Sequence, residues 1–366
     1  MVITAYHPII GGAERQAKLV AEELSKIGYT VSVITMRKSP DIPSREVING
    51  VHILRFGLGE NKINLITFLF STFLYLLIRK KEIDLIHVHQ ASYVTGVVAI
   101  ASCIRKMRWV AKLSNSGIKF DFKELKSRSF GSIFLWFVKK KCNKFIAITS
   151  NIQKELLQAG IPRGKIEVIP NGVSVSKSIS NNLRKSDLDC AKDDIVFVQV
   201  SRLTDVKNHK MIISAASKIR QKNFKILFIG DGPNRDIIKY KIDELNMGNN
   251  IKLIGSKQNI DEYYQISDVF LLPSIAEGLS NALLEACVHG LYPIVSNLAG
   301  NREVLVSKNK QLGLLLDPLD ENVWVESMSN ICKNGICLRF ENESIINRYL
   351  INNVVQRICH LYSKVI

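Results

Sequence analysis

Two glutamates in the C-terminal half, Glu277 and Glu285, stand on either side of an expected helix start. A short apolar strand over Val269–Leu272 precedes them, and a helix over Asn281–His289 contains the second. A helix N-terminus attracts anions through its free N–H groups and its dipole. The N–H groups expected to face such an anion belong to Gly278, Leu279, Ser280 and Asn281, and either Ser280 or Asn281 caps the helix. The pattern predicts a phosphate site flanked by carboxylates that bind sugar or ribose hydroxyls; the alternative is ordinary capping beside a solvent-facing glutamate.

Two cations, Arg202 and Lys207, follow a second apolar strand over Ile195–Ser201. Arg202 comes directly after the strand, and Lys207 stands at the start of an expected helix over Lys207–Arg220. Cations in such positions hold a diphosphate and stabilise the negative charge that grows on it as it leaves. The alternative is a pair of ordinary surface cations.

The N-terminal half offers two weaker candidates. Gly11 and Gly12 precede an expected helix over Ala13–Ile27, where backbone without side chains admits a phosphate or a sugar; a plain turn is the alternative. His89 ends an expected strand over Asp84–His89, at the sheet edge where α/β proteins bind ligands. It is a candidate active-site residue, and a buried structural histidine is the alternative.

Short apolar strands alternate with helical stretches, and this pattern occurs twice along the chain. In the first half the expected strands are Thr30–Met36, Val51–Phe56, Asp84–His89, Trp109–Ser114, Phe145–Thr149 and Lys165–Ile169. In the second half they are Ile195–Ser201, Lys225–Gly230, Ile251–Ile254, Val269–Leu272, Tyr292–Ser296 and Gly313–Leu316. The polar stretch 174–194 is the expected linker. The sequence thus predicts an α/β fold of two Rossmann-like, doubly wound domains that face each other across a cleft.

Bulk composition excludes several classes of protein. With 46% hydrophobic and 23% charged residues among 366, the chain can bury a large core and is not disordered. Seven scattered cysteines predict neither a disulfide framework nor a zinc site and favour a reducing, cytosolic compartment. The N-terminus lacks the pattern of a secretory signal. The longest apolar run, Ile63–Ile78, is shorter than the roughly 20 residues that span a membrane, and we expect a buried or interface-facing helix there.

The net charge of +17 is uneven. Residues 1–180 hold 27 basic and 12 acidic side chains (+15), and residues 181–366 hold the remaining 23 and 21 (+2). Residues 105–144 contain twelve basic and two acidic side chains interleaved with aromatics, a combination that suits an anionic membrane surface. The expected docking residues are Arg105, Lys106, Arg108, Lys139, Lys140 and Lys141. The alternatives are a solvated basic face over core aromatics, or nucleic-acid binding, for which the chain has the charge but no motif.

Six motifs, in their order and spacing, resemble those of the retaining glycosyltransferases of family 4, which have the GT-B architecture. The motifs are IIGGAER (9–15), DLIHVH (84–89), IPNGV (169–173), SRLTDVKN (201–208), IGDGP (229–233) and EGLSNALLE (277–285). The resemblance implies a first domain over 1–175 that binds the acceptor and a second over 190–345 that binds a nucleotide sugar. It also implies a C-terminal helix over 346–366 that packs back on the first domain.

The resemblance also implies roles for matching residues. Arg202 and Lys207 would hold the donor diphosphate, Glu285 its ribose, and Glu277 the donor sugar. The amides of 278–281 would bind the phosphates, and Gly11–Gly12 would lie against the diphosphate and sugar. The family needs no metal or other cofactor besides its co-substrate, here a UDP- or GDP-linked sugar, and it retains the anomeric configuration, with the leaving phosphate as base.

This chain departs from the family pattern in two places. Many members have a histidine after the fourth strand of the first domain; here Ser114 and Asn115 follow that strand and would contact sugar or acceptor. Only Met1–Tyr6 remain for the strand that the family has before the Gly-Gly loop, so the first strand is short or the start lies upstream.

The resulting hypothesis is a cytoplasmic hexosyltransferase, peripheral on the inner face of the cytoplasmic membrane. It would extend a lipid-linked saccharide in the synthesis of bacterial O-antigen, capsule or lipopolysaccharide. Two rivals are a non-hydrolysing nucleotide-sugar epimerase of the same fold and a basic nucleic-acid-binding protein.

Overall fold

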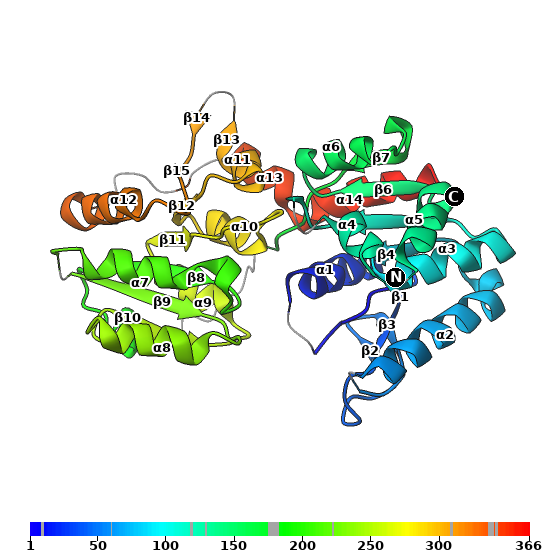
Figure 1. Cartoon of the computed structure of the whole chain (residues 1–366), viewed down its shortest axis with the longest axis horizontal. Helices are drawn as coiled ribbons and strands as arrows, with labels where there is room; N and C mark the ends of the chain where they lie inside the picture. The colour runs from blue at the N-terminus through cyan, green and yellow to red at the C-terminus, as the bar shows by residue number, and fades with distance from the viewer. Residues whose placement is uncertain are drawn as a thin grey trace. The chain divides into compact units, whose positions relative to one another are not determined.

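The computed structural model describes residues 1–8, 11–59, 61–117, 120–128, 130–174, 183–221, 223–307, 310–335, 340 and 343–366. The chain divides into two compact units (Figure 1). Unit 1 comprises Met1–Gly172 together with Tyr349–Ile366, and unit 2 comprises Val173–Arg348. Most of the expected linker 174–194 lies at the start of unit 2, and its residues 175–182 fall outside the described residues.

Unit 1 is built on a largely parallel sheet. Its strands are β1 (Ser32–Met36), β2 (Arg45–Ile48), β3 (Val51–Phe56), β4 (Ile86–His89), β5 (Trp109–Leu113), β6 (Lys144–Ala147) and β7 (Ile166–Val168). They run in the orders β1-β3-β2 and β4-β5-β6-β7. Val2 joins the two groups, because it pairs in parallel with Ile34 of β1 and with Val88 of β4. Strands β4 and β5 are buried along their whole length, as the near-continuous apolar runs of a parallel sheet require.

One strand of unit 1 breaks the expected parallel pattern. β2 pairs antiparallel with β3, and the sequence analysis did not predict it. The connection is the two-residue turn Asn49–Gly50, both at positive φ (51° and 79°), which is the backbone geometry that closes a tight hairpin. The Asn-Gly pair was the available signal. It was missed because β2 is only four residues long and half exposed.

Helices cover the sheet of unit 1. They are α1 (Gly12–Lys26), α2 (Lys62–Ile78), α3 (Tyr93–Arg105), α4 (Asp121–Lys126), α5 (Gly131–Lys141), α6 (Ser150–Gln158) and α14 (Ile351–Ser363). α14 lies against α1, and Val354 and Ile358 share a core with Val20 and Leu24 (Figure 1). The predicted return of the C-terminal helix to the first domain is therefore confirmed.

Unit 2 contains a fully parallel sheet. Its strands are β8 (Ile195–Val200), β9 (Phe224–Ile229), β10 (Ile251–Gly255), β11 (Val269–Leu272), β12 (Tyr292–Ser296) and β15 (Leu314–Leu316), in the order β10-β9-β8-β11-β12-β15. A short antiparallel pair, β13 (Val306–Ser307) and β14 (Lys310–Gln311), lies outside this sheet. The helices are α7 (His209–Ser217), α8 (Arg235–Glu244), α9 (Ile260–Gln265), α10 (Asn281–Val288), α11 (Ala299–Leu305), α12 (Glu321–Asn334) and α13 (Glu343–Tyr349).

This strand order is doubly wound. The chain moves outward through β8, β9 and β10 and then returns to the other side of β8 to add β11, β12 and β15 (Figure 1). The order reverses between β8 and β11, and α/β proteins bind ligands beyond the carboxyl ends of strands at such a switch point. The predicted α/β architecture with two Rossmann-like folds is confirmed.

Candidate functional site

The two motifs of the second half meet at the switch point of unit 2. One loop leaves β8 at Ser201 and ends in a short 3₁₀ turn over Asp205–Lys207; the other leaves β11 and ends at Ser280, before α10. β8 and β11 are hydrogen-bonded neighbours, and Ile275 N donates to Val206 O (2.9 Å) between the loops. Residues distant in sequence are thus held at one sheet edge.

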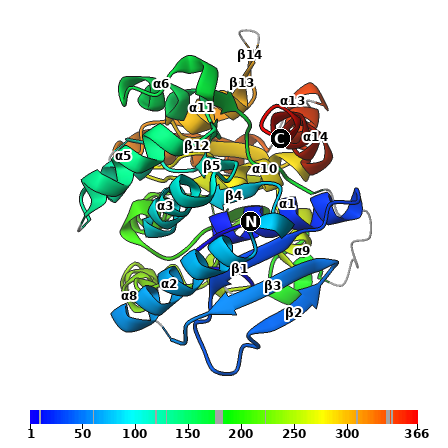
Figure 2. The same cartoon turned by 90° about the vertical axis from the view of Figure 1, so that its right-hand side faces the viewer.

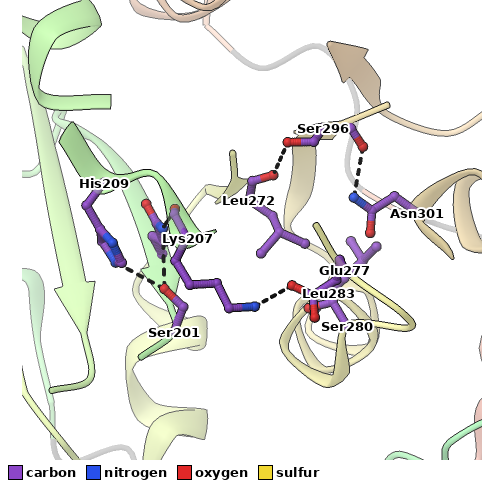
Figure 3. A network of polar contacts seen from close by, with 10 residues as sticks. Ser201, Lys207, His209, Leu272, Glu277, Ser280, Leu283, Ser296 and Asn301 are labelled. Carbon is purple, nitrogen blue, oxygen red and sulfur yellow. Dashed lines mark hydrogen bonds and ion pairs between the residues drawn. The ribbon is translucent and has the colours of Figure 1, made fainter. Parts of the chain in front are cut away.

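Lys207 and Glu277 form an ion pair between these loops (Figure 3). Their side chains are only 22% and 16% exposed, so each ion offsets the desolvation of the other. Arg202 is exposed and has no hydrogen-bond or ion-pair partner within the described part of the chain. The structure therefore presents a Lys207–Glu277 ion pair on the same loop pair that carries the exposed Arg202 shortly after β8. A diphosphate would meet both cations there, and its arrival would free the Glu277 carboxylate for hydroxyl groups.

A buried polar network supports the Lys207 loop. Gln199, within β8, donates from Nε2 to the Lys207 carbonyl (2.9 Å), and Ser201 Oγ lies 3.0 Å from His209 Nε2 (Figure 3). Burial, reinforced by the Lys207 charge, lowers the pKa of His209 to about 3, so its imidazole is neutral near pH 7. The sequence analysis missed this network. A glutamine inside the apolar strand IVFVQV was the signal for it, because a fully buried amide requires partners.

The buried His209 predicts a specific acid sensitivity. The unfolded chain takes up a proton as the pH falls through 6.5, whereas the folded chain resists protonation until about pH 3. The contribution of His209 to the free energy of unfolding is therefore fully present above pH 6.5 and is lost as the pH falls toward 3. Between pH 7.5 and pH 5 this loss is about 2 kcal/mol. We expect His209→Gln to lose correspondingly less unfolding free energy over this interval in urea titrations. The exposed His360→Gln is the control; equal pH dependence of His209→Gln and wild type would contradict the assignment.

Glycines allow a third loop to close against the Arg202 loop. A Cβ at Gly230 would lie 2.1 Å from Ser201 O, and one at Gly232 would lie 2.5 Å from Leu203 O. Leu203 also pairs with this loop, donating from its N–H to Asp231 O (3.0 Å). The G-D-G-P motif is thus explained by close backbone packing behind the cation loop.

Helix α10 begins as the sequence indicates. Ser280 is its N-cap, since Ser280 Oγ accepts from Leu283 N (3.3 Å), which decides between the two expected caps. The loop before it is packed closely: a Cβ at Gly300, in α11, would lie 1.6 Å from Gly278 O. Asn301 next to it donates to Ser296 O (2.8 Å; Figure 3). Backbone packing from α11 therefore fixes the segment that the sequence assigned to phosphate binding.

Glu285 lies one turn inside α10 and is mostly buried. The hydroxyl of Tyr264, on α9, lies 3.2 Å from Glu285 Oε2 and 3.3 Å from Ala282 O. Tyr264 is fully buried, so it orients the carboxylate from behind. Sequence analysis did not identify Tyr264, because twenty-one positions separate it from Glu285 and its helix carries no motif.

The Gly-Gly candidate lies at the start of α1 in unit 1. Gly11 is the N-cap, with extended backbone, and Gly12 is the first helical residue. The Glu14 carboxylate lies over Gly11, where a Cβ would meet its Oε2 at 2.2 Å. Ile9 and Ile10 of the same motif lie outside the described residues. Donor contact at Gly11 and Gly12 stays a prediction.

His89 is buried in unit 1 and does not face solvent. Its ring stacks on His87 with centroids 4.3 Å apart, and His87 Nδ1 lies 2.7 Å from the Tyr362 hydroxyl. Burial, with the neighbouring charges of Lys112 and the N-terminus, holds the pKa of both histidines well below the usual value. This position favours the structural alternative over sugar contact.

Ser114 and Asn115 follow β5, as expected, and are held by a residue that the sequence analysis did not single out. Their backbone N–H groups donate to Asp121 Oδ2 at 2.9 and 3.0 Å. Asp121 is buried, and burial raises its pKa to about 6 although these hydrogen bonds oppose the shift. The contact of Ser114 and Asn115 with sugar or acceptor stays a prediction.

The expected docking cations are mostly exposed. Arg105, Lys106, Arg108, Lys140 and Lys141 are exposed. Lys139 is partly buried and donates to Ala159 O (2.6 Å), which makes it the least available of the six. Within the described ranges, no helix is both long and apolar enough to cross a membrane. Among the same residues, no group of three or more His, Cys, Asp or Glu side chains is placed to hold a metal ion.

Comparison with known proteins identifies the family. The family described as "Glycosyl transferases group 1" matches residues 181–348, and the one described as "Glycosyltransferase Family 4" matches residues 10–177. Together they account for nearly the whole chain, which therefore belongs to these glycosyltransferases. The predicted family is confirmed.

Relatives and solved structures agree with this assignment. The chain is 28% identical to the Escherichia coli UDP-Gal:alpha-D-GlcNAc-diphosphoundecaprenol alpha-1,3-galactosyltransferase, over 79% of this chain and 77% of that protein. It is 24% identical to the Staphylococcus aureus capsular polysaccharide biosynthesis glycosyltransferase CapH, over 78% of each chain. The crystal structure of Anabaena HepE in complex with UDP and glucose matches with a TM-score of 0.79 at 18% identity, covering 99% of this chain and 98% of that one. The structural likeness confirms the GT-B fold.

Proposed function

We propose that this glycosyltransferase moves a hexosyl group from a nucleotide sugar to a lipid-linked saccharide during assembly of a bacterial surface polysaccharide. One observation carries the proposal: Lys207 and Glu277, from the loops after β8 and β11, form an ion pair at the switch point of unit 2, and Arg202 follows shortly after β8. The names of relatives support the substrate classes, since one acts on a diphosphoundecaprenol-linked sugar and another in capsule synthesis. HepE was crystallised with UDP, which supports a UDP-linked donor; a GDP-linked donor is the other candidate.

The donor roles follow from the chemistry of the site. Arg202 and Lys207 would hold the diphosphate, and the N–H groups of 278–281 at the start of α10 would bind its oxygens. Glu277 would leave Lys207 to accept hydrogen bonds from the donor sugar, and Glu285, oriented by Tyr264, would bind the ribose. As the glycosidic C–O bond breaks, its electron pair goes to the departing phosphate, where these cations stabilise the charge.

The proposal includes retention of the anomeric configuration. A leaving diphosphate held on one face of the sugar accepts the proton of the acceptor hydroxyl, and the new C–O bond forms on that same face. The test is the anomeric configuration of the product, read by proton NMR. Retention of the donor's configuration supports the mechanism, and clean inversion contradicts it.

We expect turnover that does not depend on a divalent cation. Arg202, Lys207 and the α10 N-terminus supply positive charge where a metal ion otherwise neutralises a diphosphate. Transfer in the presence of EDTA should equal transfer in its absence. Loss of activity in EDTA that is restored by Mg²⁺ or Mn²⁺ would refute this part of the proposal.

The proposal places the enzyme peripherally on the inner face of the cytoplasmic membrane. The exposed cations among 105–108 and 139–141 support this placement, because each cation near an anionic surface contributes about 1 kcal/mol. No nucleic-acid partner is proposed.

A further inference from the structure

Helix α2 of unit 1 exposes an apolar stripe along its whole length. The stripe residues and their exposed fractions are Ile63 (69%), Ile66 (65%), Phe70 (61%), Leu74 (39%) and Ile78 (75%). Their spacing of three or four residues puts them on one face of the helix. The opposite face carries Phe68, Thr72 and Leu76, which are buried against the unit.

The stripe carries no charged residue, since none occurs from Ile63 to Ile78. Thr67 is an exposed polar residue on the same side of the helix, and it donates its hydroxyl to Asn64 O (3.0 Å) inside the helix. Single exposed apolar residues are common on protein surfaces, but a contiguous patch of this length marks an interaction site.

Exposed apolar residues also occur on the two helices next in line to α2. α2 contacts α3, α3 contacts α5, and the three lie side by side along unit 1 in both views (Figures 1 and 2). Ile104 at the end of α3 is 58% exposed, and Ile133 and Trp136 of α5 are 55% and 54% exposed. Lys140 Nζ lies 4.7 Å from the centre of the Trp136 ring, so a cation and an exposed aromatic ring lie together on α5.

Basic residues collect at one end of these helices. Each helix leads into a parallel strand, α2 into β4, α3 into β5 and α5 into β6, so their C-terminal ends lie at the same sheet edge. The exposed cations at these ends are Arg79, Lys80, Lys81, Arg105, Lys106, Arg108, Lys140 and Lys141. Two acidic residues follow α2 here: Glu82, which pairs with Arg79 (2.7 Å), and the exposed Asp84. The balance is strongly positive.

We propose that α2 lies flat in the headgroup region of an anionic bilayer, with its stripe among the upper acyl chains and the basic edge on the lipid phosphates. An apolar helix face bordered by cations is the pattern of an interfacial helix, and charge complementarity selects an anionic lipid surface over a neutral one. The inference rests on the proposed function in one respect: a lipid-linked acceptor requires the enzyme at a membrane.

A membrane-bound α2 would also bring the predicted acceptor side of unit 1 near the lipid. α2 follows β3, so its first turn, with Ile63 and Ile66, starts at the carboxyl edge of the sheet. Ser114 and Asn115 follow β5 at this same edge. Docking through the stripe would hold the predicted acceptor side of unit 1 close to the lipid that carries the saccharide.

The first test uses flotation with vesicles of phosphatidylglycerol mixed with phosphatidylcholine, and with phosphatidylcholine alone. We expect the wild type to float with the anionic vesicles, and Ile66→Ser/Phe70→Ser to bind them about tenfold more weakly. The matched control is Ile237→Ser/Tyr240→Ser, which removes two exposed apolar residues from α8 of unit 2. Equal binding of wild type and the stripe variant would overturn the proposal, as would equal loss in the control.

The second test places a reporter on the stripe. The chain has three tryptophans, of which Trp109 and Trp324 are fully buried, so Phe70→Trp in a Trp136→Phe background adds one exposed reporter on α2. Lipids brominated in the acyl chain should quench it on vesicle binding, and should not quench Tyr240→Trp in the same background. Absence of quenching at position 70 in vesicle-bound protein would overturn the insertion.

Two measurements separate this proposal from its rivals. The stripe variant should keep the wild-type thermal shift with nucleotide sugars, so failure of docking and failure of the donor site are distinguishable. Sedimentation without lipid tests whether a second copy of the chain covers α2. The membrane proposal would be wrong if the wild type were a dimer, the stripe variant were a monomer, and neither bound vesicles. The stripe would then be the interface with a second copy of the chain.

Discussion

Glu277→Gln is expected to lower kcat by about a hundredfold to a thousandfold, because it removes the charge of the carboxylate that we propose orients the donor sugar. Lys207→Ala should cause a loss of similar size, since in our proposal the lysine stabilises the charge that develops on the leaving diphosphate. The measurement is transfer, or donor hydrolysis, at saturating nucleotide sugar. Lys210→Ala changes an exposed lysine on α7 and is the matched control, expected to keep wild-type turnover.

A double-mutant cycle separates catalysis from stability at this pair. Removal of one partner leaves the other charge partly buried and unpaired, which should cost about 1 kcal/mol of folding free energy. Lys207→Ala/Glu277→Ala should recover part of that stability, because no charge is left unpaired, yet remain as inactive as either single variant. If the double variant regained activity along with stability, the pair would be a structural ion pair and the assigned roles would be wrong.

The second large effect is expected from Gly300→Ala. The new Cβ would lie 1.6 Å from Gly278 O and 2.7 Å from Gly278 C, so backbone must move, and the backbone that moves carries the expected phosphate-binding amides. Overpacking against backbone should cost about 3 kcal/mol of unfolding free energy. Donor affinity should also fall when it is measured on fully folded protein, because the geometry of the Gly278 loop changes in the folded state itself.

The control for this prediction is another glycine of unit 2. A Cβ at Gly248 meets nothing within 4 Å, and its backbone does not have a positive φ. Gly248→Ala should therefore be neutral or slightly stabilising. Chemical denaturation and titration with the donor nucleotide measure both variants. A Gly300→Ala protein with wild-type stability and donor affinity would show that α11 does not fix the Gly278 segment.

The sequence predicted the fold well because a parallel α/β fold requires short apolar strands to alternate with helices, and this alternation is visible in the sequence. Strands β3, β11 and β12 were predicted to the residue, and the other predicted strands of both units to within two residues at each end. The antiparallel β2 and the β13–β14 pair were missed, since both are short and only a turn signal marks them.

The sequence predicted the positions of the charged residues of the candidate site at the strand ends, but not the residues that support them. Arg202, Lys207 and Glu277 stand in motifs next to strand ends, so spacing alone placed them at one edge. That Lys207 and Glu277 pair with each other could not be predicted, because seventy residues separate them and loop conformation decides the contact. Tyr264, His209 and Asp121 act from buried positions through hydrogen bonds, and a single sequence gives no spacing rule for such contacts.

His89 shows the limit of placement by strand position. It does end its strand at the carboxyl edge of the sheet, as predicted, but its ring stacks on His87 inside the unit. Alternation along a strand says that two side chains share a face, and it does not say whether that face is covered. The packing of Tyr362 from α14 against His87, 275 residues away in sequence, is what covers it.

The most direct test of the account is a panel of UDP-, GDP- and dTDP-linked sugars, scored for thermal stabilisation and for protein-dependent hydrolysis. The account predicts stabilisation by at least one nucleotide sugar and by its free nucleoside diphosphate, slow release of that diphosphate, and loss of both effects in Arg202→Ala and Lys207→Ala but not in Lys210→Ala. Silence across the whole panel, or stabilisation that the Arg202 and Lys207 variants leave intact, would contradict the assignment of a donor site to the switch point of unit 2.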